Sequence, residues 1–412
     1  MNKVTNNIVA GLDIGTNKVA ICVGQLHEGM VKIIALGTAP NYGLRKGTIE
    51  DIDLVANSIS QAIKSAEQIA GVTINEAVVG INGHHITTHL SKGVIAISRA
   101  DGCISPNDTE RVLEAAKAVA LPANREIIHV FPKKFIIDNQ EGVKDPVGMT
   151  GIRLEAEAHI IGGSTPALKN LEKCLYQASI GNAGYVFNPL ATARATLEKR
   201  QKDLGVALVD IGANTTGLAV FEEGDLVHAA VLPIGSAHLT NDIAIGLRIP
   251  IDLAEEIKLK FAVASPSMVK ESEYIDLSEL SSSEKDRIPR KYLAEIIEAR
   301  LFEIFALIRE QLQMIDRDGM LPAGIVYTGG GSLIEGLLET SKDQLRLSSQ
   351  LAKPSLEFSS LVDNIDSPMY STSIGLMLWS IENLQNKKYT NIEDNLGGVV
   401  DKVKGIFKQF LP

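Results

Sequence analysis

The sequence contains one strand–turn–strand pattern twice, once near its start and once in its second half. In the first copy, the apolar segment 8–12 enters the turn Asp13-Ile14-Gly15-Thr16, and an apolar segment follows it. In the second copy, the segment 206–209 enters Asp210-Ile211-Gly212, again with an apolar segment after it. Helical sequence follows each copy. A repeated β-rich unit with following helices predicts a duplicated, two-lobed α/β fold.

Composition excludes several classes of protein. The chain has 412 residues, of which 45% are hydrophobic and 22% charged, so it can form a sizeable core and is not a disordered chain. Its net charge of -10 argues against a nucleic-acid partner. The three cysteines are far apart, which fits neither a disulfide framework nor a zinc site. No apolar run approaches the ~18 residues of a membrane-spanning helix.

Three further segments add to the two-lobed pattern. Residues 84–161 interrupt the first half with strand-like runs and a helix start, which predicts a small inserted α/β module. A long amphipathic helix is expected at 290–314, with an apolar stripe on its buried side. A strand at 323–328 leads into Gly329-Gly330-Gly331-Ser332, and a helix is expected from Leu333. The polar segment 385–397 is expected to be a linker before a short terminal helix.

Two facing Asp-x-Gly turns can bind a phosphate chain. Tight turns direct backbone N–H groups into the cleft between them. Two carboxylates, Asp13 and Asp210, can hold a phosphate-bound Mg²⁺ through water, because Mg²⁺ keeps part of its hydration shell. The residues expected to line this part of the cleft are Asp13, Gly15, Thr16, Asn17, Lys18, Asp210, Gly212, Asn214, Thr215 and Thr216.

The glycine run Gly329-Gly330-Gly331, with Ser332, lets a nucleoside lie close to the backbone, and a following helix would favour negative charge. Glu255 and Lys258 lie three apart on one predicted helix face. Taken singly, an Asp-x-Gly hairpin is more often an ordinary turn, and Glu255–Lys258 more often a solvated ion pair. The two turns and the glycine run together favour a nucleotide; that Glu255 and Lys258 flank its nucleoside is implied only by a family resemblance.

These motifs resemble those of the actin–Hsp70–sugar kinase superfamily, and within it the FtsA family of bacterial cell-division proteins. Asp13–Thr16 and Asp210–Gly212 look like its two phosphate motifs, and Gly329–Ser332 like its adenosine motif. The segments 189–193 and 372–376 are similar to its interdomain helices. The segments 78–83 and 293–297 are similar to FtsA segments, so the resemblance covers nearly the whole chain.

The resemblance implies a division of the chain and a set of ligands. In the first lobe, subdomain 1A is expected at 1–83 and 163–204, and the inserted subdomain 1C at 84–162. In the second lobe, subdomain 2A is expected at 205–260 and 315–384, and subdomain 2B at 261–314. A flexible linker is expected at 385–397 and a membrane-targeting helix at 398–412. It implies binding of ATP and Mg²⁺. It also implies an adaptor that anchors FtsZ filaments on the cytoplasmic side of the cell membrane at the septum, recruits other division proteins and forms protofilaments.

Two departures from the family pattern bear on hydrolysis. The second phosphate motif of the family usually has a run of glycines, whereas this chain has Ala213 and Asn214 after Gly212. Asn188 precedes Pro189 where many relatives have glutamate. We therefore expect ATP to bind, and its hydrolysis to be slow or absent.

The C-terminal segment has the pattern of an interfacial helix, too short to span a bilayer. Its proposed membrane-contacting residues are Val399, Val400, Lys402, Val403, Lys404, Ile406, Phe407, Lys408, Phe410 and Leu411. A helix packed on the body or on a partner would show a similar pattern.

The family resemblance places the docking site for the C-terminal peptide of FtsZ on subdomain 2B. A groove with apolar and basic groups is expected at Arg290, Lys291, Leu293, Ile297 and Arg300. The alternative is that these charges pair with acidic residues of the same helix. Two other functions stay open from the sequence: a PilM-like adaptor of pilus assembly and an actin-fold small-molecule kinase.

Overall fold

The computed structural model describes residues 8–27, 30–45, 47–118, 122, 124–280, 286–354, 359–360, 362 and 365–393. The predicted C-terminal helix, 398–412, and all its proposed membrane-contacting residues therefore lie outside the described residues. None of the described helices has the length and apolar character needed to cross a membrane.

Strands form three sheets and two small ribbons. The strands are β1 (Ile8–Ile14), β2 (Lys18–His27), β3 (Met30–Pro40), β4 (Leu44–Arg45), β5 (Thr48–Ile49), β6 (Glu76–Ile81), β7 (Thr87–Ala96), β8 (Arg125–Ile137), β9 (Gln140–Val143), β10 (Arg153–Ser164), β11 (Gly181–Phe187), β12 (Val206–Ile211), β13 (Thr216–Glu222), β14 (Asp225–Leu232), β15 (Tyr274–Asp276), β16 (Arg287–Pro289), β17 (Ile325–Thr328), β18 (Ser349–Leu351) and β19 (Ser359–Ser360).

Helices cover the sheets and connect them. The α-helices are α1 (Ile52–Ala70), α2 (Pro106–Ala118), α3 (Thr165–Gln177), α4 (Asn188–Thr196), α5 (Lys199–Leu204), α6 (Ser236–Leu247), α7 (Ile251–Phe261), α8 (Arg290–Gln313), α9 (Leu337–Leu345) and α10 (Ser371–Glu393). Short 3₁₀ helices are η1 (Pro266–Met268), η2 (Leu277–Glu279), η3 (Gly330–Leu333) and η4 (Pro368–Tyr370).

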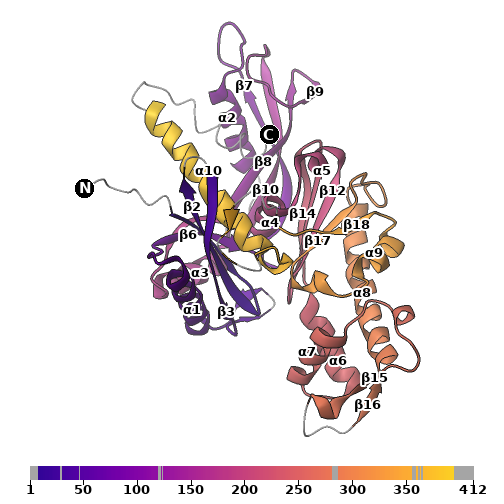
Figure 1. The fold of residues 1–412 in the computed structure, drawn as a ribbon. Helices are drawn as coiled ribbons and strands as arrows, with labels where there is room; N and C mark the ends of the chain where they lie inside the picture. The colour runs from indigo at the N-terminus through magenta and orange to yellow at the C-terminus, as the bar shows by residue number, and fades with distance from the viewer. Residues whose placement is uncertain are drawn as a thin grey trace.

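The two lobes repeat one strand order, which confirms the predicted duplication. The first sheet runs β11-β6-β1-β2-β3-β19 and the second runs β14-β13-β12-β17-β18. In each, an antiparallel hairpin, β1–β2 or β12–β13, pairs through its first strand with a parallel strand, β6 or β17. Equal topology places the two Asp-x-Gly turns at equivalent ends of their sheets. Figure 1 shows the lobes side by side with α4 and α10 between them.

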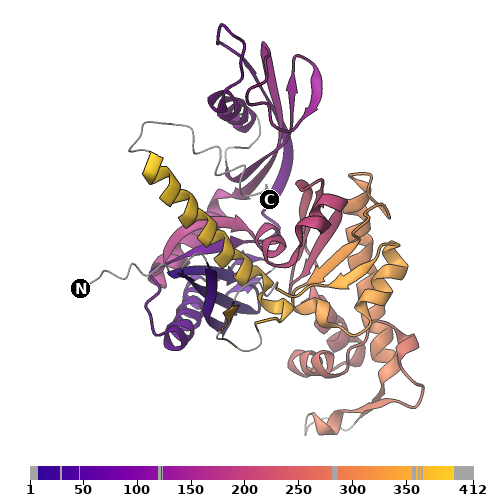
Figure 2. The ribbon, with the colours of Figure 1, turned by 45° about the horizontal axis from the view of Figure 1, so that its top comes forward.

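The predicted insert is a separate sheet of order β7-β10-β8-β9 with α2 packed on one face. It leaves the first lobe after β6 and returns through β10 into α3. Gly93 allows α2 to approach, since a Cβ there would lie 2.1 Å from the carbonyl oxygen of Val112. Figure 2 shows the insert projecting away from the rest of the first lobe.

α4 and α10 pack tightly where the lobes meet. A Cβ on Gly375 of α10 would lie 1.8 Å from the carbonyl oxygen of Ala191 on α4, so only glycine allows this contact. Gly11 of β1 is equally close to α10, at 2.2 Å from the backbone nitrogen of Met377. These backbone contacts fix the first sheet against the connecting helices, and thereby fix Asp13 at the end of β1.

Two boundary predictions are wrong. Residues 385–393, expected to be part of a linker, continue α10 to Glu393; polar residues such as Gln385 and Lys387 have good helix propensity and need no buried face. The helix expected from Leu333 is instead the 3₁₀ helix η3, and α9 starts only at Leu337. The long helix expected at 290–314 is confirmed as α8.

Candidate functional site

The two Asp-x-Gly turns have the same hydrogen-bond pattern. The N–H of Gly15 donates to the carbonyl of Lys18 at 3.0 Å, and the N–H of Gly212 donates to the carbonyl of Thr215 at 2.9 Å. Both glycine N–H groups are therefore used inside their turns. Within the described chain, the turn residues outside the strands whose N–H groups make no backbone hydrogen bond are Thr16, Asn17, Ala213, Asn214 and Thr215. These five donors remain for a ligand such as a phosphate.

The loss of the family's glycines is compatible with this geometry. Neither Ala213 nor Asn214 has a positive φ. Side chains at these positions therefore cause no backbone strain. The second turn forms without the glycine run that the family pattern led us to expect.

Asp13 lies close enough to Asp210 for the charge of Asp210 to destabilise its ionised form. Burial, and then the charge of Asp210, raise the pKa of Asp13 to about 6, while Lys18 and Asn188 oppose the rise. Burial also raises the pKa of Asp210. Two carboxylates with raised pKa values indicate negative charge that the protein alone does not neutralise. A divalent cation between them would do so, and the residues thus fit a Mg²⁺ ion.

Lys18 lies close to both carboxylates but donates elsewhere. Its Nζ is 2.7 Å from the carbonyl oxygen of Met369 and 4.3 Å from the ring centroid of Tyr370. Burial lowers the pKa of Lys18, and the two aspartates oppose that change. Lys18 thus links the first turn to η4 at the start of α10.

Residues of the connecting helices orient both aspartates. Nδ2 of Asn188 donates to Oδ1 of Asp13 at 3.0 Å. Thr192 and Thr372 donate to Oδ2 of Asp210 at 3.2 and 3.1 Å. The segments 189–193 and 372–376 were expected to be connecting helices, but these orienting roles were not predicted. The only sequence feature that could have indicated them is the presence of hydroxyl and amide groups in otherwise apolar segments.

Gly329 requires glycine for two reasons. Its φ is +82°, and a Cβ would lie 2.3 Å from Oδ1 of Asp210. Gly331 is similarly close to Ile211, at 2.4 Å from Cγ2. The predicted adenosine turn therefore lies directly beside the predicted metal-binding aspartate of the second turn, as a single nucleotide site requires.

Two predicted ligand donors have other partners. The Thr216 side chain is fully buried, and its hydroxyl donates to the carbonyl of Ile234 at 2.8 Å. The hydroxyl of Ser332 donates to the carbonyl of Gly329 at 2.7 Å. These hydroxyls are therefore used within the protein, because strand alternation turns Thr216 inward and the 3₁₀ turn closes on Ser332. Nucleotide contacts of the two residues stay a prediction. The helix dipole expected from Leu333 is also missing, since α9 begins four residues later, at Leu337.

Glu255 and Lys258 form a buried network between α6 and α7. Nζ of Lys258 is 2.7 Å from Oε2 of Glu255 and 2.9 Å from Oγ1 of Thr240. α6 starts against the second turn, where the N–H of Ser236 donates to the carbonyl of Gly212 at 2.9 Å. The ion pair is thus connected to the phosphate turn through α6. Its contact with a nucleoside stays a prediction.

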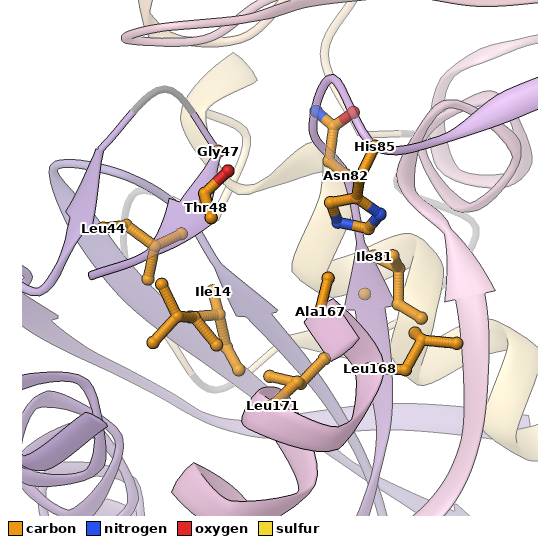
Figure 3. Close-up of a pocket in the computed structure, with 12 residues that line it drawn as sticks. Ile14, Leu44, Gly47, Thr48, Ile81, Asn82, His85, Ala167, Leu168 and Leu171 are labelled. Carbon is orange, nitrogen blue, oxygen red and sulfur yellow. The ribbon is translucent and has the colours of Figure 1, made fainter. Parts of the chain in front are cut away.

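A hydrogen bond crosses the cleft from the first lobe. Nδ2 of Asn82 donates to Oγ1 of Thr215 in the second turn at 3.3 Å. Below Asn82 lies a small cavity of ≈ 40 Å³ between Ile14, His85 and Leu168 (Figure 3). It is far smaller than a ligand site of a few hundred Å³ and is mostly apolar. This cavity is therefore too small to hold a nucleotide, and the surface between the two turns remains the predicted site.

The predicted docking groove on α8 is wrong in its apolar part. Leu293 and Ile297 are both 0% exposed and belong to the core of the second lobe. An apolar helix stripe packs against the body of its own protein, so these residues cannot contact a partner. The basic residues pair locally: Arg290 with Glu273, Lys291 with Glu271, and Arg300 with Asp242 and Glu303.

Family models match two parts of the chain. Residues 207–375 match "Cell division protein FtsA", and residues 83–162 match "SHS2 domain inserted in FTSA". The Cell division protein FtsA of Pseudomonas aeruginosa is 39% identical over 379 residues, covering 92% of this chain and 90% of the relative. The FtsA of Borreliella burgdorferi is 33% identical and covers 98% of this chain and 99% of the relative.

Solved structures share the fold at low sequence identity. The PilM–PilN type IV pilus biogenesis complex matches with a TM-score of 0.67 and 16% identity, covering 90% of this chain and 98% of that one. MreB5 of Spiroplasma citri bound to ADP matches with a TM-score of 0.54 and 15% identity, covering 93% and 98%. These likenesses establish the actin-like fold that the sequence predicted.

Proposed function

This chain belongs to the FtsA family of bacterial cell-division proteins, and we propose that it is an ATP-binding adaptor that anchors FtsZ filaments to the cytoplasmic membrane. One observation supports the nucleotide part above all: two turns with the same hydrogen-bond pattern leave backbone N–H groups available beside Asp13 and Asp210. Asp13 and Asp210 would hold Mg²⁺, which would neutralise phosphate charge when bound, and the turns would orient the phosphates. MreB5, which shares the fold, is described bound to ADP.

Weak or absent hydrolysis fits the same site. Rapid phosphoryl transfer needs a group that orients or activates the attacking water. Asn188 stands beside Asp13 with an amide, which cannot accept a proton as a carboxylate does. Nucleotide binding then serves to set the conformation of the adaptor and its association into protofilaments, with turnover below about 1 s⁻¹.

The docking surface for an FtsZ peptide is revised to the outer side of α6 and α8. Ile245 is 76% exposed and Tyr292 44% exposed. The Tyr292 hydroxyl lies 3.5 Å from the carbonyl oxygen of Gly246, so α6 and α8 are adjacent here. The exposed Arg248 adds positive charge at the end of α6. We infer that this strip binds the mixed apolar and acidic C-terminal peptide of FtsZ, in place of the buried Leu293 and Ile297.

The other division proteins are proposed to bind the insert, and the membrane to bind residues 398–412. One tail gives marginal affinity, because each lysine near an anionic surface contributes about 1 kcal/mol. A filament multiplies these tails without new contacts. A small-molecule kinase has no use for such a tail, and the PilM complex is a structural neighbour at only 16% identity.

Co-sedimentation with anionic vesicles tests the proposal. Full-length protein with ATP·Mg²⁺ should carry FtsZ filaments to the vesicles. A chain ending at Glu393 should bind FtsZ but leave it in solution. FtsZ that reaches the vesicles with the shortened chain, or that stays in solution with the full chain, contradicts the anchoring function.

A further inference from the structure

The hydrogen bond between Asn82 and Thr215 has a defined direction. Oδ1 of Asn82 accepts from the N–H of Gly83 at 3.0 Å. Because a backbone N–H can only donate, the amide oxygen must face Gly83. The amide nitrogen therefore faces Thr215, 3.3 Å away, and donates to its hydroxyl. The first lobe thus supplies a donor to the phosphate turn of the second lobe.

This direction determines what the Thr215 hydroxyl can do. A threonine hydroxyl has one proton to donate and accepts through its lone pairs. Because Asn82 donates to Oγ1 of Thr215, the hydroxyl proton of Thr215 must point away from Asn82. None of the described residues accepts this proton. Phosphate oxygens only accept hydrogen bonds. The amide of Asn82 would then donate to the hydroxyl of Thr215, and that hydroxyl would donate to a phosphate oxygen. Each of these two hydrogen bonds would strengthen the other.

Asn82 is also at the root of the insert. β6 ends at Ile81 and β7 begins at Thr87, so Asn82 and Gly83 are the first residues outside the first sheet. Gly83 has a φ of +136°. The insert then contacts the second lobe directly: Oγ1 of Thr88 donates to the carbonyl of Ala229 at 2.8 Å.

A second contact joins the far end of the insert to the same lobe. Nζ of Lys144 lies 3.0 Å from the carboxylate of Glu223 and 3.7 Å from that of Asp225, at the start of β14. The insert is therefore covalently part of the first lobe and hydrogen-bonded to the second. Asn82 lies at the root of the insert, in the segment between β6 and β7 that leads to the Thr88 attachment.

We propose that Asn82 is a positioning residue for phosphate recognition, which orients the Thr215 hydroxyl toward the phosphate chain and thereby couples phosphate binding to the attachment of the insert. The proposal rests on the proposed nucleotide site. It assigns to this asparagine a role in both ligand binding and the placement of the insert.

Calorimetric titration of full-length protein with AMPPNP·Mg²⁺ tests the binding step. Asn82→Ala should weaken binding about three- to tenfold, the effect of losing one hydrogen bond. Asn82→Asp should weaken it at least as much, because a carboxylate cannot donate to Thr215 and repels phosphate. Asn182→Ala, which changes an exposed asparagine in the same lobe, is the matched control and should bind like the parent.

A double mutant and a second readout separate positioning from a general structural role. In a Thr215→Val background, Asn82→Ala should cause no further loss of affinity. Hydrogen exchange at residues 84–96 should slow on AMPPNP binding in the parent and not in Asn82→Ala. Equal losses in both backgrounds, parent-like affinity of Asn82→Ala, or unchanged exchange in the parent would overturn the proposal. If the parent itself binds no nucleotide, the proposed function fails and this inference with it.

Discussion

Asn188 donates a hydrogen bond to the carboxylate of Asp13, 3.0 Å away, and so favours the ionised form of that carboxylate. Removing the donor should therefore raise the pKa of Asp13 further above about 6. Losing about 1 kcal/mol of stabilisation corresponds to about 0.7 pKa units. In Asn188→Ala, the pH below which ATP·Mg²⁺ affinity declines should move up by that amount. Titrations between pH 5 and 8 measure it, with Asn182→Ala as control; an unshifted profile contradicts the assignment.

Asp13→Asn should stabilise the nucleotide-free protein at neutral pH. The folded pKa of Asp13, about 6, lies above the ordinary 3.8. The folded state therefore binds the extra proton between these values, and stability rises as pH falls from 6 toward 4. Above pH 6 the full cost of burying the charge remains, at most about 3 kcal/mol.

Thermal unfolding at pH 7.5 and 4.5 measures this difference. Asp13→Asn should raise the midpoint at pH 7.5 and change it little at pH 4.5. The same variant should lose Mg²⁺-dependent ATP binding, because the amide carries no charge. A variant that is less stable than the parent at pH 7.5 would show that Asp13 is already neutralised within the protein.

Gly329→Ala should impair nucleotide binding while Gly330→Ala should not. A Cβ at Gly329 would lie 2.3 Å from Asp210 and the backbone has a φ of +82°, so the turn must move. At Gly330 the nearest atom to a Cβ is Cγ of Met369 at 3.6 Å, an ordinary contact. We expect Gly329→Ala to lose about 1–3 kcal/mol of stability and at least tenfold in ATP affinity. Calorimetry and denaturant unfolding of both variants decide it, and equal behaviour of the pair would refute the assigned role.

Ile245→Glu should weaken binding of the FtsZ C-terminal peptide. The change places a negative charge on an exposed apolar residue of the proposed strip, opposite an acidic peptide, and leaves the core intact. Tyr176→Glu alters an 86% exposed residue on the first lobe and serves as the control. Fluorescence anisotropy at two salt concentrations should show an affinity loss of at least fivefold, about 1 kcal/mol, for Ile245→Glu alone. If both variants bind like the parent, the strip is not the docking site.

Phe407→Glu should abolish vesicle binding of the full-length chain. A charge in the centre of the apolar face opposes insertion at the membrane interface. Flotation with anionic vesicles checks this, and Gln409→Glu, on the opposite face of the predicted helix, should retain most binding. Retained binding by Phe407→Glu would indicate that the tail packs on protein instead.

The sequence predicts those parts of the fold that repeat or have a strong period. The two Asp-x-Gly turns, the insert and α8 follow from local patterns, and the structure confirms them. Leu293 and Ile297 lie on the expected buried stripe, but their docking role was wrong, because periodicity shows that a helix has an apolar face and not what covers it. The apolar face of α8 packs against the second sheet and its neighbouring helices in the same protein.

The site was predicted less completely than the fold. Asp13, Asp210 and Gly329 were identified because their motifs are local. Asn188, Thr192 and Thr372 reach the aspartates from helices far apart in the chain, and only the fold brings them together. The sequence does not show where the hydroxyls of Thr216 and Ser332 point, because neighbours along a strand or tight turn point in different directions.

The continuation of α10 to Glu393 changes what connects the body to the C-terminal segment. Its end extends past the first sheet in Figures 1 and 2. The helical residues 383–393 rise by roughly 16 Å at 1.5 Å each. A helix of this kind holds its end in a fixed direction from the body, so the point from which the chain continues after Glu393 is set by the orientation of the body. Subunits joined in a row would therefore present these points at regular intervals along the filament.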